Sequence, residues 1–316
     1  MTFTIPSKQD LIDAHRRIEL YINETPILTS SMMNEMSGCE VFFKCENFQK
    51  VGAFKYRGAT NAILQLTPEE LSKGVATHSS GNHAQALALA AKVQGVQAHI
   101  VMPRTAPQVK VDAVKGYGAN ITFCEPTLQA REDTLAKVVE ATGASEIHPF
   151  DNDAVIAGQS TVAQELLEEV PNLDVIMAPV GGGGLLSGTA LAAHYFSPQT
   201  EVIAAEPEGA DDAFRSFQAK VLIPSVEPKT IADGLLTSLS ERTFNIIQQH
   251  VKGIYTVSEE EIIAAMKLTW QRMKIVIEPS SAVPIAALFK HKNELQGKRI
   301  GVIISGGNVD LERLPF

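Results

Sequence analysis

The sequence predicts an α/β fold in which helices cover parallel β-sheets. Strand-like apolar runs alternate with helix-like segments along nearly all of the 316 residues, which is typical of a parallel sheet. Three of these runs end in turns of glycine and small polar residues, at 79–82, 181–184 and 305–308. The chain is also long enough for two domain-sized hydrophobic cores.

Local signals place the first elements. Ser7 is expected to cap a helix whose apolar residues keep helical spacing, namely Leu11, Ala14, Ile18 and Tyr21. A strand is predicted over 40–46 and a helix from about Lys55. Thr67 begins a capping box, with proline at the first position of the helix that follows.

The later elements continue the alternation to the C-terminus. We predict further strands at 75–79, 98–102, 120–124, 175–180, 201–205, 254–257 and 299–304. An alanine-rich buried helix is expected over 83–93, a helix of small residues after 181–184, and a helix capped by Ser258 with Glu261. The composition does not change abruptly along the chain, so it marks no domain boundary.

Composition limits the partners and the compartment. The formal net charge is −9 and there is no basic stripe, so we expect no binding to nucleic acid or to anionic membranes. No apolar run approaches the ~20 residues of a membrane span, and the N-terminus has no basic region before an apolar core. Cys39, Cys45 and Cys124 lack C-x-x-C spacing and are interpreted as structural thiols. These features predict a cytoplasmic protein.

The turn at Gly181–Gly184 is predicted to hold an anionic group. Four successive glycines cost backbone entropy, but they let backbone N–H groups approach an anion at the start of a helix. A dinucleotide fingerprint is the alternative, because Gly182-x-Gly184-x-x-Ser187 follows a strand and Glu206 stands near the required distance. That alternative, an NAD-dependent dehydrogenase, leaves the other glycine turns and Lys55 without a role.

Lys55 has a sequence context that suits a reactive amine. It opens a predicted helix, where a cation is unfavourable, and it lies among glycine and aromatic residues in 44–58. A surface lysine is the ordinary interpretation of such a residue. A desolvated amine of lowered pKa is the other interpretation, and an imine-forming lysine requires that state.

Seven segments resemble the serine racemases and the serine/threonine dehydratases, which are fold-type-II pyridoxal-phosphate enzymes. They follow in the family's order along almost the whole chain, and are Lys44–Gly58, Thr77–Ala86, Pro179–Gly184, Ala205–Pro207, Ile231–Gly234, Ile277–Pro279 and Ser305–Asp310. The resemblance implies two open, twisted parallel-sheet domains with pyridoxal 5'-phosphate between them. The large domain would hold residues 1–67 and 149–316, and the small, mobile domain residues 68–148.

The resemblance also assigns the cofactor site. It implies that Lys55 is the cofactor lysine, that Asn82 hydrogen-bonds the ring hydroxyl, and that Ser305 faces the pyridine nitrogen. The implied phosphate loop consists of Gly181, Gly182, Gly183, Gly184 and Leu185. Unlike a carboxylate, the Ser305 hydroxyl does not hold the nitrogen protonated, so the ring is a weaker electron sink. This suits β-elimination and disfavours transamination.

The turn at 79–83 bears on the reaction. Threonine dehydratases generally have Ser-Ala-Gly-Asn-His at this turn, whereas serine racemases have Ser-Ser-Gly-Asn-His, as this chain does. Racemisation needs a proton donor on each face of the substrate, and the resemblance assigns Lys55 to one face and Ser80 to the other. A helix cap is the alternative role for Ser80, and hydroxyaspartate dehydratases can share the serine pair. The implied substrate-binding residues are Ser79, Ser80, Asn82, His83, Arg131 and Thr237, with His148 nearby.

The resemblance further implies a metal site, a nucleotide site and a dimer. Glu206, Asp212 and the Ala210 carbonyl match the family's divalent-metal site, where Mg²⁺ or another hard cation would order the loop. Serine racemases bind ATP between subunits, and the matching residues are Asn23, Ser30, Ser31, Met32, Lys50, Tyr117, Lys274 and Asn308. We therefore expect a homodimer with ATP as an activator.

The expected activity is racemisation of serine together with dehydration of L-serine, giving D-serine and pyruvate plus ammonia. A threonine or 3-hydroxyaspartate dehydratase without significant racemisation is the alternative on the same fold. Cysteine-synthase-like β-replacement is disfavoured, because its lysine usually lies in Ser-x-Lys-Asp-Arg and this one lies in Phe54–Arg57. The preferred amino acid stays open, since Phe150 and Asp151 are typical of threonine dehydratases and Thr237 replaces a serine.

Overall fold

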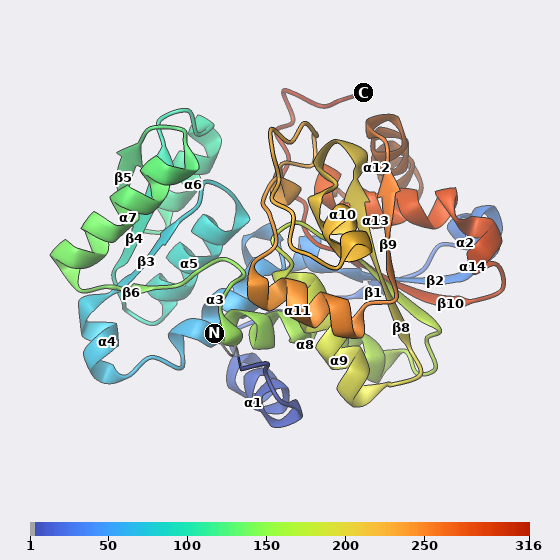
Figure 1. The fold of residues 1–316 in the computed structure, drawn as a ribbon, viewed down its shortest axis with the longest axis horizontal. Coiled ribbons are helices and arrows are strands. Elements are labelled where there is room, and N and C mark those ends of the chain that lie inside the picture. Colours follow the sequence, from blue (N-terminus) through green and yellow to red (C-terminus); the bar gives the residue numbers. More distant parts are fainter. Residues whose placement is uncertain (1–3) are drawn as a thin grey trace.

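Residues 4–316, which the computed structural model describes, form two β-sheets flanked by helices (Figure 1). The larger sheet has six strands in the order β1-β2-β10-β7-β8-β9, and the smaller has four in the order β5-β4-β3-β6. In Figure 1 the smaller sheet lies to the left, the larger sheet to the right, and α3 (Lys55–Ile63) between them. The arrangement confirms the predicted α/β class.

The strands are short and come from the two ends and the middle of the chain. Their bounds are β1 Ile27–Leu28, β2 Glu40–Cys45, β3 Val75–His78, β4 Ala98–Pro103, β5 Asn120–Cys124, β6 Ser145–Glu146, β7 Val175–Pro179, β8 Glu201–Pro207, β9 Gly253–Val257 and β10 Arg299–Ile304. The smaller sheet is thus built from one continuous stretch, residues 75–146. The larger sheet combines strands on both sides of that stretch.

The α-helices connect successive strands and cover both sheets. Their bounds are α1 Lys8–Ile18, α2 Ser31–Ser37, α3 Lys55–Ile63, α4 Pro68–Lys73, α5 Asn82–Val93, α6 Gln108–Gly116, α7 Leu128–Thr142, α8 Asp153–Glu169, α9 Gly184–Phe196, α10 Asp212–Ala219, α11 Glu241–His250, α12 Glu259–Met273, α13 Pro279–Lys290 and α14 Lys292–Leu295. Single 3₁₀ turns occur at η1 Glu46–Phe48, η2 Lys50–Gly52, η3 Glu208–Ala210 and η4 Asp233–Leu235.

The strand pairing is parallel except at one edge. In β2 and β10 the register runs from Glu40 opposite Arg299 to Cys45 opposite Ile304, and β10 pairs in the same sense with β7. The two-residue strand β1 pairs antiparallel with β2 and was not predicted from the sequence. Because β10 and β7 are neighbours and parallel, the turns that follow them meet at one edge of the sheet, where ligands bind in such folds.

Alternate residues of the strands enter different cores, as expected for a sheet covered on both faces. In β7, Val175 and Met177 pack with residues of α12 and α13. Ile176 and Ala178 of the same strand pack with residues of α8 and α9. The smaller sheet has its own core, which it shares with α3 and α5.

Helix α8 lies against both α3 and α9 at glycines. A Cβ built on Gly158 of α8 would lie 2.7 Å from the Cα atom of Gly58 in α3. A Cβ on Gly188 of α9 would lie 2.7 Å from the backbone nitrogen of Ser160 in α8. Any larger side chain would force these helices apart. Helix α8 therefore sets the spacing between the helix that begins with the predicted reactive lysine and the helix that follows the glycine turn.

Some boundaries differ from the sequence prediction. Helix α1 ends at Ile18, because Tyr21 lies in a turn in which its N–H donates to the Ile18 carbonyl at 2.8 Å. Strand β3 ends at His78, and α5 begins at Asn82, one residue earlier than predicted. The predicted N-cap at Ser7 and the predicted capping signals at Thr67 and Ser258 are confirmed, and all three form complete capping boxes. The three cysteines are buried thiols, and among residues 4–316 no helix is long and apolar enough to cross a bilayer.

Candidate active site

Lys55 is the first residue of α3, the helix that lies between the two sheets. The amine donates a hydrogen bond to the Pro149 carbonyl at 3.0 Å. Burial lowers the pKa of Lys55 to about 8, and the nearby Glu278 carboxyl opposes this only in part. The N–H of the preceding residue, Phe54, donates to the Ser305 carbonyl at 3.0 Å. The structure therefore places Lys55 beside the turn that follows β10.

The glycine turn follows β7 and leads directly into α9. Gly183 has a φ of 85°, which favours glycine, and it is the N-cap residue. Within residues 4–316 no side chain caps this helix, so backbone N–H groups of its first turn are available to an anion. A Cβ on Gly182 would lie 2.2 Å from the Phe150 ring. Pro149 accepts the hydrogen bond from Lys55 and Phe150 packs against the glycine turn, so these two consecutive residues contact both parts of the site.

The buried carboxyl group of Glu278 joins the start of α5 to the turn after β10. Both oxygens of Glu278 accept from the Asn82 side chain at 3.1 Å, and one accepts from the Asn308 N–H at 3.2 Å. The Asn308 side chain donates to Asn82 Oδ1 at 2.9 Å. Burial raises the pKa of Glu278 to about 7. No role was predicted for Glu278, which lies between Ile277 and Pro279 in one of the segments that resemble the family.

The Ser305 side chain is fixed by its neighbours. Its hydroxyl lies 3.0 Å from the Ser281 hydroxyl, and Ser281 Oγ accepts from the Gly306 N–H at 2.8 Å. Ser305 is buried, and no carboxylate replaces it at the position predicted to face the ring nitrogen. The hydroxyl is therefore held in one place by a serine pair that the sequence did not reveal.

Ser80 does not cap the helix that follows the turn at 79–82. The N-cap residue of α5 is Gly81, and within the described chain no side chain accepts from the first-turn N–H groups of α5 as a cap. The Ser79 hydroxyl accepts from the Gly81 N–H at 3.3 Å, which shapes the turn. Ser80 is half-buried. The structure therefore does not show the helix cap that was the alternative role for Ser80.

The histidines near this turn are held as neutral bases. His83 is buried, and its Nε2 lies 3.0 Å from the Ile147 carbonyl. Burial lowers the pKa of His83 to about 3 and that of His148 to about 4. The His148 Nδ1 accepts from the Asp151 N–H at 2.8 Å. The other ring nitrogen of His83, Nδ1, is buried and has no hydrogen-bond partner within residues 4–316.

The other two predicted substrate residues lie in different surroundings. Arg131 lies in the first turn of α7, and its buried Nε has no hydrogen-bond partner within residues 4–316. An unsatisfied buried guanidinium N–H is costly unless an anion binds it. Thr237 is exposed, in the loop that runs on from Leu235. A Cβ on Gly181 would lie 2.9 Å from Leu235, so this loop passes the glycine turn.

The predicted metal residues gather at the end of β8. Glu206 and Asp212 are both buried, and Ala210 lies between them in η3. The Glu206 carboxylate accepts from the Ala213 and Phe214 N–H groups at 3.0 and 2.8 Å. Neither oxygen of Asp212 has a well-formed hydrogen bond within the part of the chain that the structure describes. Burial raises the pKa of Glu206 to about 9 and that of Asp212 to about 6, so this donor set fits a divalent cation. The described residues contain no cluster of three metal-ligating side chains, and the predicted site has two carboxylates and a backbone carbonyl.

The predicted nucleotide residues form separate groups within one chain. Gln49 Oε1 accepts from the backbone N–H groups of Asn23 and Lys50 at 2.9 and 3.0 Å. Asn308 donates to the Val51 carbonyl at 2.7 Å, next to Lys50 in sequence. The other residues lie at the ends of three helices: Ser30, Ser31 and Met32 at α2, Tyr117 at α6 and Lys274 at α12.

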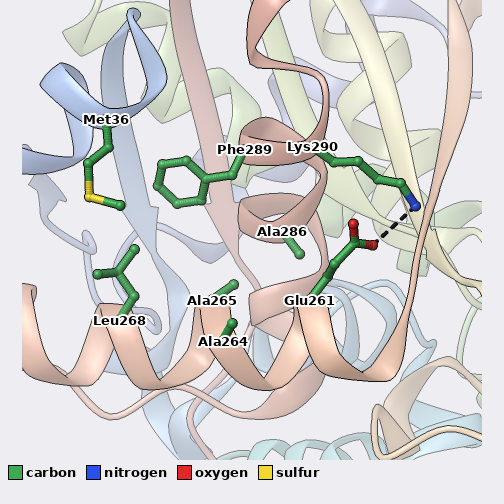
Figure 2. A pocket seen from close by; sticks show the side chains of 8 residues that line it. All are labelled: Met36, Glu261, Ala264, Ala265, Leu268, Ala286, Phe289 and Lys290. Carbon is green, nitrogen blue, oxygen red and sulfur yellow. Dashed lines mark ion pairs between the residues drawn. The ribbon is translucent and has the colours of Figure 1, made fainter.

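An apolar pocket lies away from these residues. Its volume is about 350 Å³, and it is lined by side chains of α2, α12 and α13, including Met36, Leu268 and Phe289 (Figure 2). At one end Lys290 pairs with Glu261 at 3.1 Å. Among the described residues, those that line this pocket include none of the predicted site residues, so it is separate from the candidate active site.

Residues 18–306 match the family model described as "Pyridoxal-phosphate dependent enzyme". The chain belongs to this family. It is 54% identical over 312 residues to a β-hydroxyaspartate dehydratase of Paracoccus denitrificans (strain Pd 1222), with 99% of each chain covered. It is also similar to the serine racemase of Dictyostelium discoideum (54% identity, TM-score 0.92, covering 96% of this chain and 98% of that chain). Maize serine racemase gives 44% identity and a TM-score of 0.96, covering 98% of this chain and 95% of that chain.

Membership in the pyridoxal-phosphate dependent enzyme family confirms the resemblance and the fold-type-II class. The residues present fit the cofactor, because a desolvated amine, an uncapped glycine turn and a fixed hydroxyl lie at one sheet edge. The dinucleotide interpretation needed Glu206 to bind a ribose, but its carboxylate is buried against α10. The protein is therefore an enzyme of this family and does not fit the nicotinamide-dependent alternative.

Proposed function

We propose that this chain is a pyridoxal-phosphate-dependent serine racemase with L-serine dehydratase activity. The observation that carries the proposal is the turn at 79–82, where the Ser80 hydroxyl is half-buried and does not cap α5. A second proton donor is what a racemase needs beyond a dehydratase. Lys55, with a pKa of about 8, supplies the first.

We assign each step of proton transfer and cofactor binding to a group of the chain. The Lys55 amine takes the α-proton from one face of L-serine, and Ser80 delivers a proton to the other face. Backbone N–H groups at Gly181–Leu185 would hold the phosphate, and the Ser305 hydroxyl would hydrogen-bond the ring nitrogen without protonating it. The bound cofactor supplies electron withdrawal from the α-carbon. When the β-hydroxyl leaves as water in place of reprotonation, aminoacrylate results, and one water molecule hydrolyses it to pyruvate and ammonia.

The proposal is tested by incubating the purified holoenzyme with L-serine, L-threonine and 3-hydroxyaspartate in turn. Keto acid and D-isomer are measured together for each substrate. We expect D-serine and pyruvate from L-serine, and the variant Lys55→Ala should lose both products and the visible cofactor band while it stays folded. Keto acid without any D-serine from the wild type would instead identify a dehydratase.

A 3-hydroxyaspartate dehydratase is the second candidate function. The unpartnered buried Nε of Arg131 favours a substrate with a second carboxylate, and the relative from Paracoccus denitrificans carries that activity in its name. Arg131→Gln should then lower kcat/KM for 3-hydroxyaspartate by ~10-fold or more, as expected for a charge-assisted hydrogen bond, and change that for L-serine much less. Equal losses on both substrates would show that Arg131 does not select the second carboxylate.

We further propose the effector sites and the moving part. Mg²⁺ would bind Glu206, Asp212 and the Ala210 carbonyl, and ATP would bind between the subunits of a homodimer. The large domain would hold residues 1–67 and 149–316, and residues 68–148 would move as one unit over the substrate. In support, the smaller sheet arises wholly within that segment, and Lys110 of that segment pairs with Asp233 outside it.

A further inference from the structure

A group of four buried charges lies directly behind Lys55. Two are cations, Lys44 of β2 and Arg57 of α3, and two are carboxylates, Glu46 of η1 and Glu165 of α8. The side chains of Lys44, Arg57 and Glu46 are fully inaccessible, and that of Glu165 is 6% exposed. We call these four residues the charge cluster. Its formal charges cancel, as burial requires.

Arg57 is the centre of the charge cluster. Its Nε and Nη2 atoms donate to the two oxygens of Glu46, each at 2.8 Å. Its Nη1 and Nη2 atoms donate to the two oxygens of Glu165. The guanidinium therefore holds two carboxylates at once, with two bonds to each. A planar guanidinium fixes direction as well as distance in this geometry.

Further contacts hold the two carboxylates in place. Lys44 Nζ lies 2.7 Å from the second oxygen of Glu165. The Thr25 hydroxyl donates to Glu46 at 2.6 Å, and Arg57 Nη1 donates to the Thr161 hydroxyl at 3.1 Å. Burial works against the charged form of Glu165, yet the hydrogen bonds from Arg57 hold its pKa below the ordinary value. Each member of the cluster thus lies within hydrogen-bonding distance of at least one member of opposite formal charge.

Such a cluster is better suited to fixing geometry than to adding stability. Buried ion pairs are often no more stabilising than apolar residues of the same size, because both charges must leave water. A cluster with four directional bonds from one side chain does, however, define how α3 lies along α8. The contact between Gly58 and Gly158 fixes how far apart these helices lie. Two neutral hydrogen bonds also join them, from the Gly58 N–H to Gln159 Oε1 at 3.2 Å and from the Asn61 side chain to the Ala154 carbonyl at 2.6 Å. Arg57 adds the two charge-assisted bonds to Glu165, which are the stronger kind.

The placement of α3 along α8 matters because α8 and the residues before it contact the other parts of the site. Pro149 accepts the Lys55 hydrogen bond. Phe150 packs against Gly182 and Gly184 of the glycine turn. Arg57 follows Lys55 by two residues, so a shift of the guanidinium relative to Glu165 would carry the amine with it.

We infer that Arg57, held by Glu46 and Glu165, is a positioning residue that sets the Lys55 amine against the glycine turn. The inference rests on the proposed function, since it takes Lys55 as the reactive amine. Arg57 itself does not touch the substrate. Its role is to hold α3 at the axial position along α8 at which the Lys55 amine and the glycine turn can bind the same cofactor molecule.

The test is Arg57→Lys, which keeps the buried positive charge and removes the planar fork. A single ammonium cannot make two bonds to each of two carboxylates. We expect kcat for L-serine to fall by about 10- to 100-fold, because small displacements of a reacting group cost rates of this order. KM should change by less than about threefold, and the rate at which the apoenzyme binds pyridoxal phosphate covalently should fall with kcat.

Two further variants keep the test decisive. Glu168→Gln changes a polar residue on the exposed side of α8, outside the charge cluster, and serves as the control: it should leave kcat, cofactor capture and Tm as in the wild type. Thr161→Val removes the bond from Arg57 and the bond that the Thr161 hydroxyl donates to the Gly158 carbonyl within α8, without changing formal charge. It should fold and lower kcat about three- to tenfold, which decides the matter if Arg57→Lys does not fold.

The outcomes separate this inference from the proposed function. If the wild type fails to capture pyridoxal phosphate at Lys55, the proposed function is wrong. If the wild type captures it and Arg57→Lys or Thr161→Val keeps wild-type kcat and capture rate, the positioning role is wrong. A lower Tm with unchanged kcat in a folded variant would likewise overturn it, since that is the result expected of a merely structural cluster.

Discussion

The lowered pKa of Lys55 leads to a prediction about how the apoenzyme takes up its cofactor. Only the uncharged amine can attack the aldehyde of pyridoxal phosphate. The rate of capture should therefore follow the free-amine fraction of Lys55 as pH rises. We expect a midpoint near pH 8, the pKa to which burial lowers this residue, and not near 10.5, the ordinary value for lysine.

The size of the effect follows from this difference of about 2.5 units, or roughly 3 kcal/mol. At pH 7.5 about a quarter of the Lys55 amines are uncharged, against roughly one in a thousand for an ordinary lysine. Capture at that pH should thus be about two hundredfold faster than for an amine of ordinary pKa. The Glu278 carboxyl raises the pKa of Lys55, so Glu278→Gln should move the midpoint below that of the wild type.

The assay mixes apoenzyme with pyridoxal phosphate across pH 6–10 and records the growth of the visible band. Lys55→Ala should show no band and serves as the blank. A wild-type midpoint near 10.5 would refute the desolvated amine. A midpoint that rises in Glu278→Gln would refute the assigned electrostatic influence of that carboxyl, whose own pKa is about 7 and which is mostly ionised at pH 8.

Two other predictions concern the second proton donor and the effectors. In Ser80→Ala the rate of serine racemisation should fall by ~10²–10⁴-fold, and D-serine elimination should also be lost, while L-serine elimination survives. Racemisation and elimination are each measured on both enantiomers. Unchanged D-serine formation would show that Ser80 has no catalytic role. Mg²⁺ at a hundredfold excess over its Kd should stabilise the wild type by about 2.7 kcal/mol, and Glu206→Ala or Asp212→Ala should remove the gain in Tm without removing the cofactor. A Tm that chelator does not change in the wild type would exclude the metal site, and activity indifferent to added ATP would exclude the nucleotide site.

Much of the fold could be predicted because its signals are local. Ser7, Thr67 and Ser258 are capping residues whose partners lie three positions away, and all three boxes form. Helix α8 received no prediction of its own, because it is buried against helices on two sides and lacks a single apolar stripe. Strands β1 and β6, of two residues each, depend on pairing with distant strands and leave no pattern in so short a run.

In the candidate site, too, the residues with local sequence signals were predicted, and those defined by distant contacts were missed. Lys55 and the glycine turn stand out in the sequence because each combines unusual residue types within a few positions. Glu278 was missed because its importance comes from Asn82, 196 residues away, and no local spacing indicates that contact. The pairing of Glu165 with Arg57 spans 108 residues and was missed for the same reason.

The order of strands in the larger sheet has a consequence for synthesis on the ribosome. Strand β2 is made early, but apart from the two-residue β1 its partner is β10, which begins only at residue 299. The smaller sheet is complete by residue 146 and can fold while the rest is still being translated. A nascent or truncated chain without β10 would expose the β2 edge and lack Ser305. Chaperone dependence and aggregation of such truncations should therefore rise sharply when residues 299–305 are lost.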